Sequence, residues 1–270
     1  MDYEIIDFHT HCFPDELAAR AIPELAARAG IRPSADGTVS GLLRSMNEAG
    51  ITRSVVHSIA TKPSQTVRIN DWALSVMEQN ENITAFGTIH PLFDGWKAEI
   101  SRIAGLGFKG VKFHPEYQDF YVDDERCFPL YEKIFAEGMM ILFHAGEDIG
   151  FPGPYHCMPE MLARVLDRFP EGIFIAAHMG GYRRYGEVVE QLAGRDNLYL
   201  DTSYCLGEMG CDMALRIISE HGTDRILFAT DSPWKSQIEL VGQLKALDMS
   251  DDDKKAVFSG NAVRLLRLEI

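Results

Sequence analysis

The chain alternates between two hydrophobic patterns along its whole length. Eight short runs rich in β-branched and aromatic residues are each followed by turn residues and then, in most cases, by apolar side chains three and four positions apart. Most of the eight runs are almost continuously apolar, which is typical of parallel strands covered by helices on both faces. The expected strands are 5–11, 54–61, 83–90, 108–114, 139–145, 173–179, 198–203 and 225–231.

Seven amphipathic helices are expected between these strands. They span 71–79, 96–104, 130–136, 158–168, 185–192, 213–220 and 237–247. Eight strand and helix alternations predict a (β/α)8 barrel of the TIM type. An open doubly wound sheet would instead place a glycine-rich phosphate turn after its first strand, where this chain has His9-Thr10-His11. No interior linker or repeat divides the sequence, so we expect one α/β domain over residues 1–270.

Two connections depart from the regular alternation. Residues 12–53 form a long first crossover, and residues 146–157 are rich in glycine and proline. We expect the second segment to be a long loop. In a barrel, both segments follow the carboxyl end of a strand, so both are expected to lie over the mouth.

Composition and charge exclude several classes of protein. The net charge of −14 would repel a phosphate backbone, so nucleic-acid binding is not expected. No apolar run reaches the roughly 20 residues that span a bilayer, and the first residues lack the pattern of a signal peptide. We therefore expect a cytoplasmic protein without a membrane partner. Five cysteines without a CxxC pair indicate reduced thiols. A homo-oligomer is compatible with the sequence, which does not determine the oligomeric state.

Polar residues gather at the predicted strand ends, where the active sites of such barrels lie. Six of the nine histidines and one aspartate occupy these positions: His9, His11, His90, His114, His144, His178 and Asp231. A single histidine at a strand end is usually a core or surface residue. The joint pattern is harder to explain by packing, because each buried polar group needs a partner. A divalent metal supplies one, and imidazole with carboxylate suits zinc, with manganese, iron or cobalt as alternatives.

The motifs around these residues resemble the metal-site signature of the amidohydrolase superfamily. They are His9-Thr-His11, Phe-His144-Ala-Gly, Ala-His178-Met-Gly-Gly and Ala-Thr-Asp231-Ser-Pro. The segment 107–115 is similar to the amidohydrolase-related branch, which contains metal-dependent hydrolases and aromatic-acid decarboxylases. The resemblance implies His9, His11, His144 and Asp231 as ligands of one metal, usually zinc. It implies His178 as a catalytic residue or as a ligand of a second metal.

Lys112 leaves two arrangements open. In the binuclear relatives that the resemblance suggests, a carbamylated lysine on the fourth strand bridges two metals. In a site with one metal, the lysine stays cationic and pairs with a substrate carboxylate or a neighbouring aspartate. We expect one zinc ion per chain.

A small-molecule substrate is expected in the mouth. Asp231 is placed to accept a proton from an attacking water, and His178 to polarise a carbonyl or orient that water. Lys112, His114, His90, Tyr117, Arg183 and Trp234 are the expected substrate-binding residues.

Two reaction classes and one non-enzymatic role fit these residues. We expect a metal-dependent hydrolase that cleaves an amide, ester or lactone bond of a small, carboxylated molecule. The alternative is a metal-dependent, non-oxidative decarboxylase of an aromatic or unsaturated acid. Only the length of 270 residues, short for the decarboxylases that the chain resembles, favours hydrolysis. A metal-binding scaffold without activity is the third reading, and an open metal site at a barrel mouth argues against it.

Overall fold

Eight parallel strands form a nearly closed barrel. The structure is a computed structural model that describes residues 3–268. The strands pair in chain order, each with the next. They are β1 (Ile6–Thr10), β2 (Arg53–His57), β3 (Ile83–Thr88), β4 (Gly110–Phe113), β5 (Met140–Phe143), β6 (Phe174–Ala176), β7 (Leu198–Asp201) and β8 (Ile226–Leu227). Hydrogen bonds from Phe8 N–H to Phe228 O and from Asp231 N–H to His9 O, both 2.8 Å, join the last strand to the first. The predicted barrel is confirmed.

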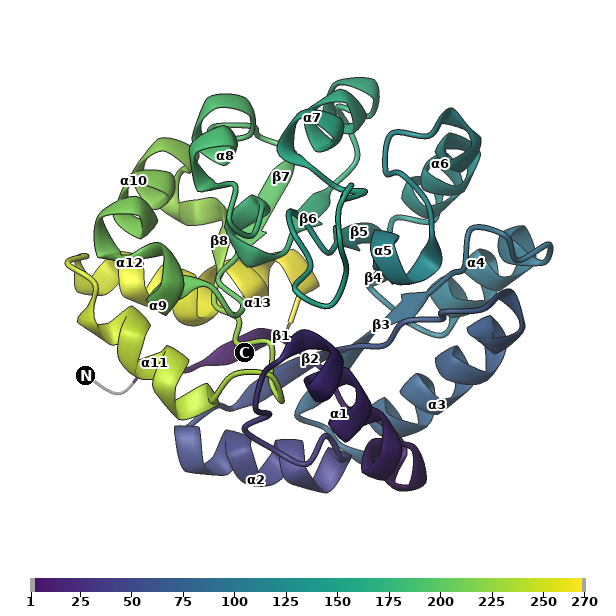
Figure 1. Ribbon diagram of the computed structural model, residues 1–270, viewed down its shortest axis with the longest axis horizontal. Coiled ribbons are helices and arrows are strands. Elements are labelled where there is room, and N and C mark those ends of the chain that lie inside the picture. Colours follow the sequence, from purple (N-terminus) through teal and green to yellow (C-terminus); the bar gives the residue numbers. More distant parts are fainter. Residues whose placement is uncertain (1–2, 269–270) are drawn as a thin grey trace.

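Helices surround the strands in a ring that follows the order of the chain (Figure 1). The seven expected helices are present as α3 (Thr66–Gln79), α4 (Trp96–Gly105), α6 (Phe128–Ala136), α7 (Pro159–Arg168), α8 (Tyr185–Gln191), α10 (Cys211–His221) and α11 (Gln237–Ala246). Shorter helices are also present: α5 (Pro115–Gln118), α9 (Leu206–Met209), α12 (Asp251–Lys255) and α13 (Asn261–Leu266). No helix among residues 3–268 is long and apolar enough to span a membrane.

Two helices in the first crossover were not anticipated. They are α1 (Asp15–Ala29) and α2 (Val39–Ala49). Helix α1 buries Ala18, Ile22 and Ala26, and two of these three side chains are too small to stand out as an apolar stripe in the sequence. The segment 146–157 contains no helix, as expected, and only an isolated bridge from Gly146 to Tyr182.

The core has two layers. One cluster fills the barrel itself with side chains such as Phe8, Phe86 and Leu142, and Leu266 of α13 packs against it. The larger cluster lies between the strands and the surrounding helices. Burial of apolar surface on both faces of the strands stabilises the barrel.

An extra residue in β1 directs its histidines into the barrel. Asp7 is opposite Ser54, but Thr10 is opposite Val56, so three steps on β1 match two on β2. This irregularity is a β-bulge, which re-aims side chains next to many active sites. It allows Phe8 to belong to the barrel interior while the neighbouring His9 lines the mouth.

Candidate metal centre

The carboxyl ends of the strands open into a cavity of about 800 Å³. All but two of the predicted site residues line it: His9, His11, Lys112, His114, Tyr117, His144, His178, Asp231 and Trp234. The exceptions are His90 and Arg183. His90 lies two residues beyond β3, where its Nδ1 accepts a hydrogen bond from Leu92 N–H. Arg183 stacks on the Tyr182 ring and is 56% exposed. The expectation that these residues lie in the mouth of the barrel therefore holds for most of them but not for His90 and Arg183.

His9, His11 and Asp231 form a group whose ligand atoms all lie within 4.8 Å of one another. Asp231 Oδ1 is 3.0 Å from His11 Nε2 and 3.8 Å from His9 Nε2. Two imidazole nitrogens and one carboxylate oxygen form a donor set that suits a divalent transition metal. Three protein ligands also leave a coordination position open, as in catalytic rather than structural sites.

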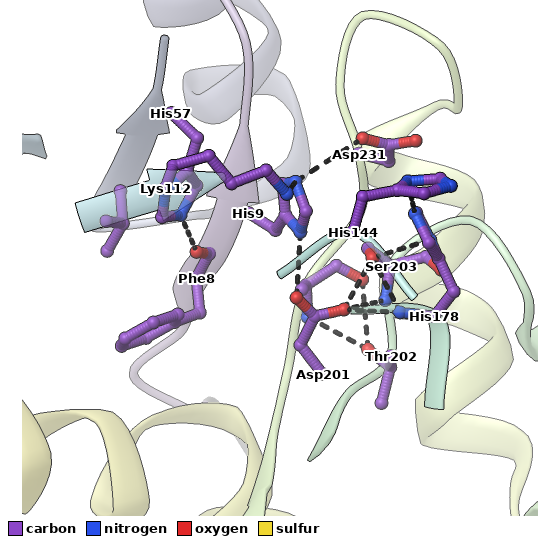
Figure 2. Close-up of polar contacts among 12 residues, drawn as sticks. Phe8, His9, His57, Lys112, His144, His178, Asp201, Thr202, Ser203 and Asp231 are labelled. Atoms are coloured by element: carbon purple, nitrogen blue, oxygen red, sulfur yellow. Dashed lines mark hydrogen bonds and ion pairs between the residues drawn. The ribbon is translucent and has the colours of Figure 1, made fainter. Parts of the chain in front are cut away.

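Neighbouring acceptors fix the tautomers of both histidines in this group. His9 Nδ1 is 2.7 Å from Asp201 Oδ2, and His11 Nδ1 is 2.7 Å from the carbonyl oxygen of His57. Because both acceptors require a proton on Nδ1, each Nε2 is unprotonated and carries a lone pair. Such outer partners orient metal-ligating histidines and raise their basicity. Figure 2 shows His9 held between Asp201 and Lys112.

The same Asp201 also holds His178. Asp201 Oδ1 accepts hydrogen bonds from His178 N–H and Ser203 N–H, each 3.0 Å long. His178 Nδ1 is 3.0 Å from the carbonyl oxygen of Ser203, which requires the proton on Nδ1. His178 and Asp231 both have left-handed backbones, with φ of 58° and 67°. Such strain in residues other than glycine is often found at functional sites.

Burial keeps His9 and His144 neutral. Desolvation, with the nearby charge of Lys112, holds the pKa of His9 well below its ordinary value. Desolvation likewise lowers the pKa of His144, with contributions from His114 and His178. Neutral imidazoles are the form that binds metals. Lys112 is also buried, with Nζ 3.2 Å from His9 Nε2. Desolvation lowers its pKa to about 8, although Asp201 and Asp231 oppose the shift.

His144 falls in a second group of possible ligands in the described part of the chain. Its ligand atom lies within 4.8 Å of those of His114 and Asp148. His144 Nδ1 is 3.0 Å from His178 Nε2 (Figure 2). The resemblance implied His144 as a ligand of the first metal. Its Nε2 lies 3.8 Å from Asp148 Oδ2, and its role as a ligand of the first metal stays a prediction.

Three residues of this centre were not singled out from the sequence. Asp201 ends β7, Asp148 follows β5 and His57 ends β2. His57 is buried and also lines the cavity. The search of strand ends that identified His9 could also have found Asp201, but the expected strand 54–61 placed His57 inside the strand, whereas β2 ends at His57. Asp148 gives no such signal, since a loop carries it back to the mouth.

Apolar and aromatic side chains form much of the cavity wall above the polar floor. Helix α1 contributes Leu17 and Leu25, helix α3 contributes Ile69 and Trp72, and Ile59 follows β2. Such a wall is suited to a planar apolar ring that has few polar atoms.

Comparison with known proteins defines the class to which this barrel belongs. The amidohydrolase family model matches residues 6–268. The chain therefore belongs to the amidohydrolase family, and the suspected relationship is confirmed.

Individual relatives are decarboxylases. The γ-resorcylate decarboxylase of Polaromonas sp. strain JS666 is 24% identical over an alignment of 287 positions that spans 84% of this chain and 86% of that protein. The structure of 5-carboxyvanillate decarboxylase from Sphingomonas paucimobilis is similar with a TM-score of 0.73 and 19% identity, covering 99% of this chain and 100% of that one. The structure of a dihydroxybenzoic acid decarboxylase from Polaromonas sp. JS666 contains bound manganese and the inhibitor 2-nitroresorcinol. It is similar with a TM-score of 0.71 and 19% identity, covering 98% of this chain and 97% of that one.

These relatives overturn the prediction of a hydrolase. That prediction depended on the short chain, yet the alignment covers 86% of the γ-resorcylate decarboxylase. Length therefore does not separate the two reactions. The residues could not separate them either, because a metal between histidines and an aspartate serves both hydrolysis and decarboxylation.

Proposed function

We propose that this protein is a metal-dependent, non-oxidative decarboxylase of an aromatic acid that carries a ring hydroxyl. The observation that carries the proposal is the 24% identity to γ-resorcylate decarboxylase along 84% of the chain. The cavity supports it independently, because Trp72, Ile59 and Ile69 give it apolar walls above a polar floor. Such walls keep bulk water away from a ring whose carbon must carry negative charge when carbon dioxide leaves.

His9, His11 and Asp231 are the proposed ligands of the catalytic metal, and the histidine tautomers and the neutral state of His9 fit that role. His144 is the fourth proposed ligand, as the resemblance implies. A divalent metal supplies Lewis-acid polarisation of substrate oxygens when it is bound. Manganese is supported by the bound ion of the related decarboxylase. Zinc, which we first expected, suits the same ligands.

Side chains of this chain supply the remaining chemistry. Lys112 holds a positive charge in a buried position beside His9 and can attract the substrate carboxylate into the mouth. When carbon dioxide leaves, the ring carbon needs a proton. Asp231 faces the cavity and can hold and return that proton, and His178 Nε2 is the second candidate. His114, Tyr117 and Trp234 are proposed to contact the substrate.

The proposal is tested by carbon dioxide release from a panel of hydroxybenzoic acids, including 2,6-dihydroxybenzoate and 5-carboxyvanillate. Protein reconstituted with Mn²⁺ or Zn²⁺ should decarboxylate at least one of them, and chelated protein should not. Asp231→Asn should lose at least about 10²-fold in rate, as expected for a lost proton-transfer group. The same replacement at exposed Asp196 is the matched control. Absence of carbon dioxide release from the whole panel with either metal would contradict the proposal.

A further inference from the structure

The cavity at the barrel mouth is larger than one aromatic ring requires. Its volume is about 800 Å³, whereas a cavity of about 150 Å³ is enough to hold benzene. Cavities of roughly 300–1,000 Å³ hold ligands of drug size. A hydroxybenzoic acid that lies on the polar floor, beside His9 and Lys112, therefore leaves most of this volume unfilled.

Helix α1 presents a second apolar face to this volume. Its first apolar face is buried in the protein and consists of two alanines and Ile22. The second face carries Leu17, Ala21 and Leu25, which are four positions apart and line the cavity. Leu17 is 40% exposed, and the other two side chains are half-buried. A surface helix of a globular protein usually has polar residues on the side away from the core, so this face indicates an apolar ligand.

Helix α3 supplies further apolar side chains to the same cavity. Ile69 and Trp72, three positions apart on one face of α3, are half-buried and line it. Figure 1 shows α1 and α3 beside each other at one edge of the barrel. An apolar group bound between these two helices would therefore contact carbon atoms from both.

Arg28 fixes the position of α1 over the mouth. Its guanidinium carbon lies 5.6 Å from the centre of the Phe151 ring and 6.0 Å from that of the Tyr117 ring. Cation–π contacts at these distances are favourable. Phe151 belongs to the loop after β5, so this contact connects the end of α1 to the opposite part of the chain. The apolar face of α1 is thus held in place before any ligand binds.

The charge of the floor determines which part of a ligand reaches this apolar wall. Buried Lys112 attracts the carboxylate of a benzoate. The ring carbon opposite the carboxylate, position 4, then points away from Lys112 and out of the barrel. Helix α1 follows the carboxyl end of β1 and lies on that outer side. A substituent at position 4 is therefore directed towards α1 and α3.

We propose that the substrate is a hydroxybenzoic acid with an apolar substituent of several carbons at position 4, and that Leu25 and Ile69 bind this substituent. The inference rests on the proposed function, which places the carboxylate at the floor. It adds the part of the substrate that the floor does not contact. Recognition of this part depends on the burial of apolar surface and needs no charged partner.

Binding of a homologous series of acids tests this inference without turnover. The ligands are 2-hydroxybenzoates with a methyl, propyl or pentyl group at position 4. Their Kd values for Mn²⁺-loaded, full-length protein are measured by isothermal titration calorimetry. Each fully buried methylene corresponds to about fourfold in Kd. The pentyl acid should therefore bind at least about tenfold more tightly than the methyl acid.

Two variants locate the binding site of the substituent. Leu25→Ser and Ile69→Ser should each weaken the pentyl acid by at least about fivefold and the methyl acid by less than about twofold, because only the longer chain reaches these side chains. Both positions are half-buried, and circular dichroism checks the fold of each variant. Ile238→Ser is the matched control, at a 54% exposed residue of α11 outside the cavity, and should bind all three acids like wild type.

The outcomes separate this inference from the proposed reaction. Equal Kd values for the three acids, or no binding of any of them, would overturn the inference. A pentyl advantage that persists undiminished in both variants would also overturn it, because the substituent would then lie elsewhere. Carbon dioxide release is measured separately on the same acids. Kd values in the expected order without carbon dioxide release would support the apolar site and contradict only the proposed reaction.

Discussion

At the scale of single residues, hydrogen bonds decide which nitrogen of each histidine is free. His9, His11 and His144 each donate from Nδ1, to Asp201, to a carbonyl oxygen and to His178 respectively. Their Nε2 atoms remain as lone-pair donors that face the cavity. The chemistry of the mouth therefore depends on acceptors that do not themselves bind metal.

Among these acceptors, Asp201 is expected to have the largest effect on metal affinity. Asp201→Asn removes the charged acceptor of His9 Nδ1 and weakens the hold on His178. Metal affinity at the first group should fall by roughly 10 to 100-fold with the fold intact, as measured by competition with a chelating dye. Asp196→Asn, at an aspartate whose side chain is 96% exposed, is the control. Equal affinity in both variants would show that Asp201 does not position the ligand.

His221 links stability to pH away from the mouth. It is fully buried, its Nε2–H donates to Leu198 O, and its Nδ1 accepts from Gly194 N–H. Both contacts require the neutral ring, and burial lowers its pKa to about 4. In the unfolded chain the pKa is about 6.5. Between these values the unfolded state binds more protons, so the free energy of unfolding falls as pH falls from about 6.5 towards 4.

The size of this effect can be measured by urea unfolding. Between pH 7.5 and pH 5, protonation of His221 in the unfolded chain should lower the free energy of unfolding of wild type by about 2 kcal/mol. The His221→Gln protein lacks this titrating group. Its free energy of unfolding should therefore fall by about 2 kcal/mol less than that of wild type over the same pH interval. The other buried histidines titrate in both proteins and cancel in the comparison. Identical pH dependence in the two proteins would contradict the assignment.

At the scale of elements, the strands were predictable and the backbone details were not. Continuous apolar runs predicted all eight strands, because burial on both faces requires them. Helix α1 was missed because Ala18 and Ala26 provide its buried face. The bulge in β1 that turns both Phe8 and His9 inward depends on pairing with β2, which no local pattern encodes. Asp148 was missed because a loop, rather than a strand, places it.

Gly146 joins the loop after β5 to the segment after β6. Its φ is +86°, and an added Cβ would lie 2.2 Å from Tyr182 N and 2.5 Å from Gly181 C. These are backbone atoms rather than the movable end of a side chain. Gly146→Ala should therefore lower the free energy of unfolding by at least about 2 kcal/mol.

A matched glycine in α11 provides the control. A Cβ at Gly242 meets no atom within 4 Å, and the residue lies within the helix. Gly242→Ala should raise the free energy of unfolding by about 0.5–1 kcal/mol, because alanine loses less backbone entropy in a helix. Urea unfolding of both variants measures the contrast. A Gly146→Ala protein as stable as wild type would show that this close approach is not required.

At the scale of the whole molecule, the barrel brings together residues far apart in the sequence. His9 and Asp231 are 222 positions apart, yet closure between β1 and β8 places their ligand atoms 3.8 Å apart. The proximity of His9 and Asp231 follows from the prediction of a barrel, because the carboxyl ends of its strands converge at one mouth. The reaction did not follow, because it depends on how a substrate lies in the cavity rather than on which donors surround the metal.

We propose that this site removes carbon dioxide from an aromatic acid. This proposal is tested most directly by mass spectrometry of the aromatic product formed from an active substrate of the panel, in D₂O and, separately, in ¹⁸O-labelled water. Decarboxylation replaces the carboxylate with one proton from solvent, so the product should carry a single deuterium at that ring carbon and no ¹⁸O. A product that keeps its carboxylate carbon and gains ¹⁸O would contradict the account.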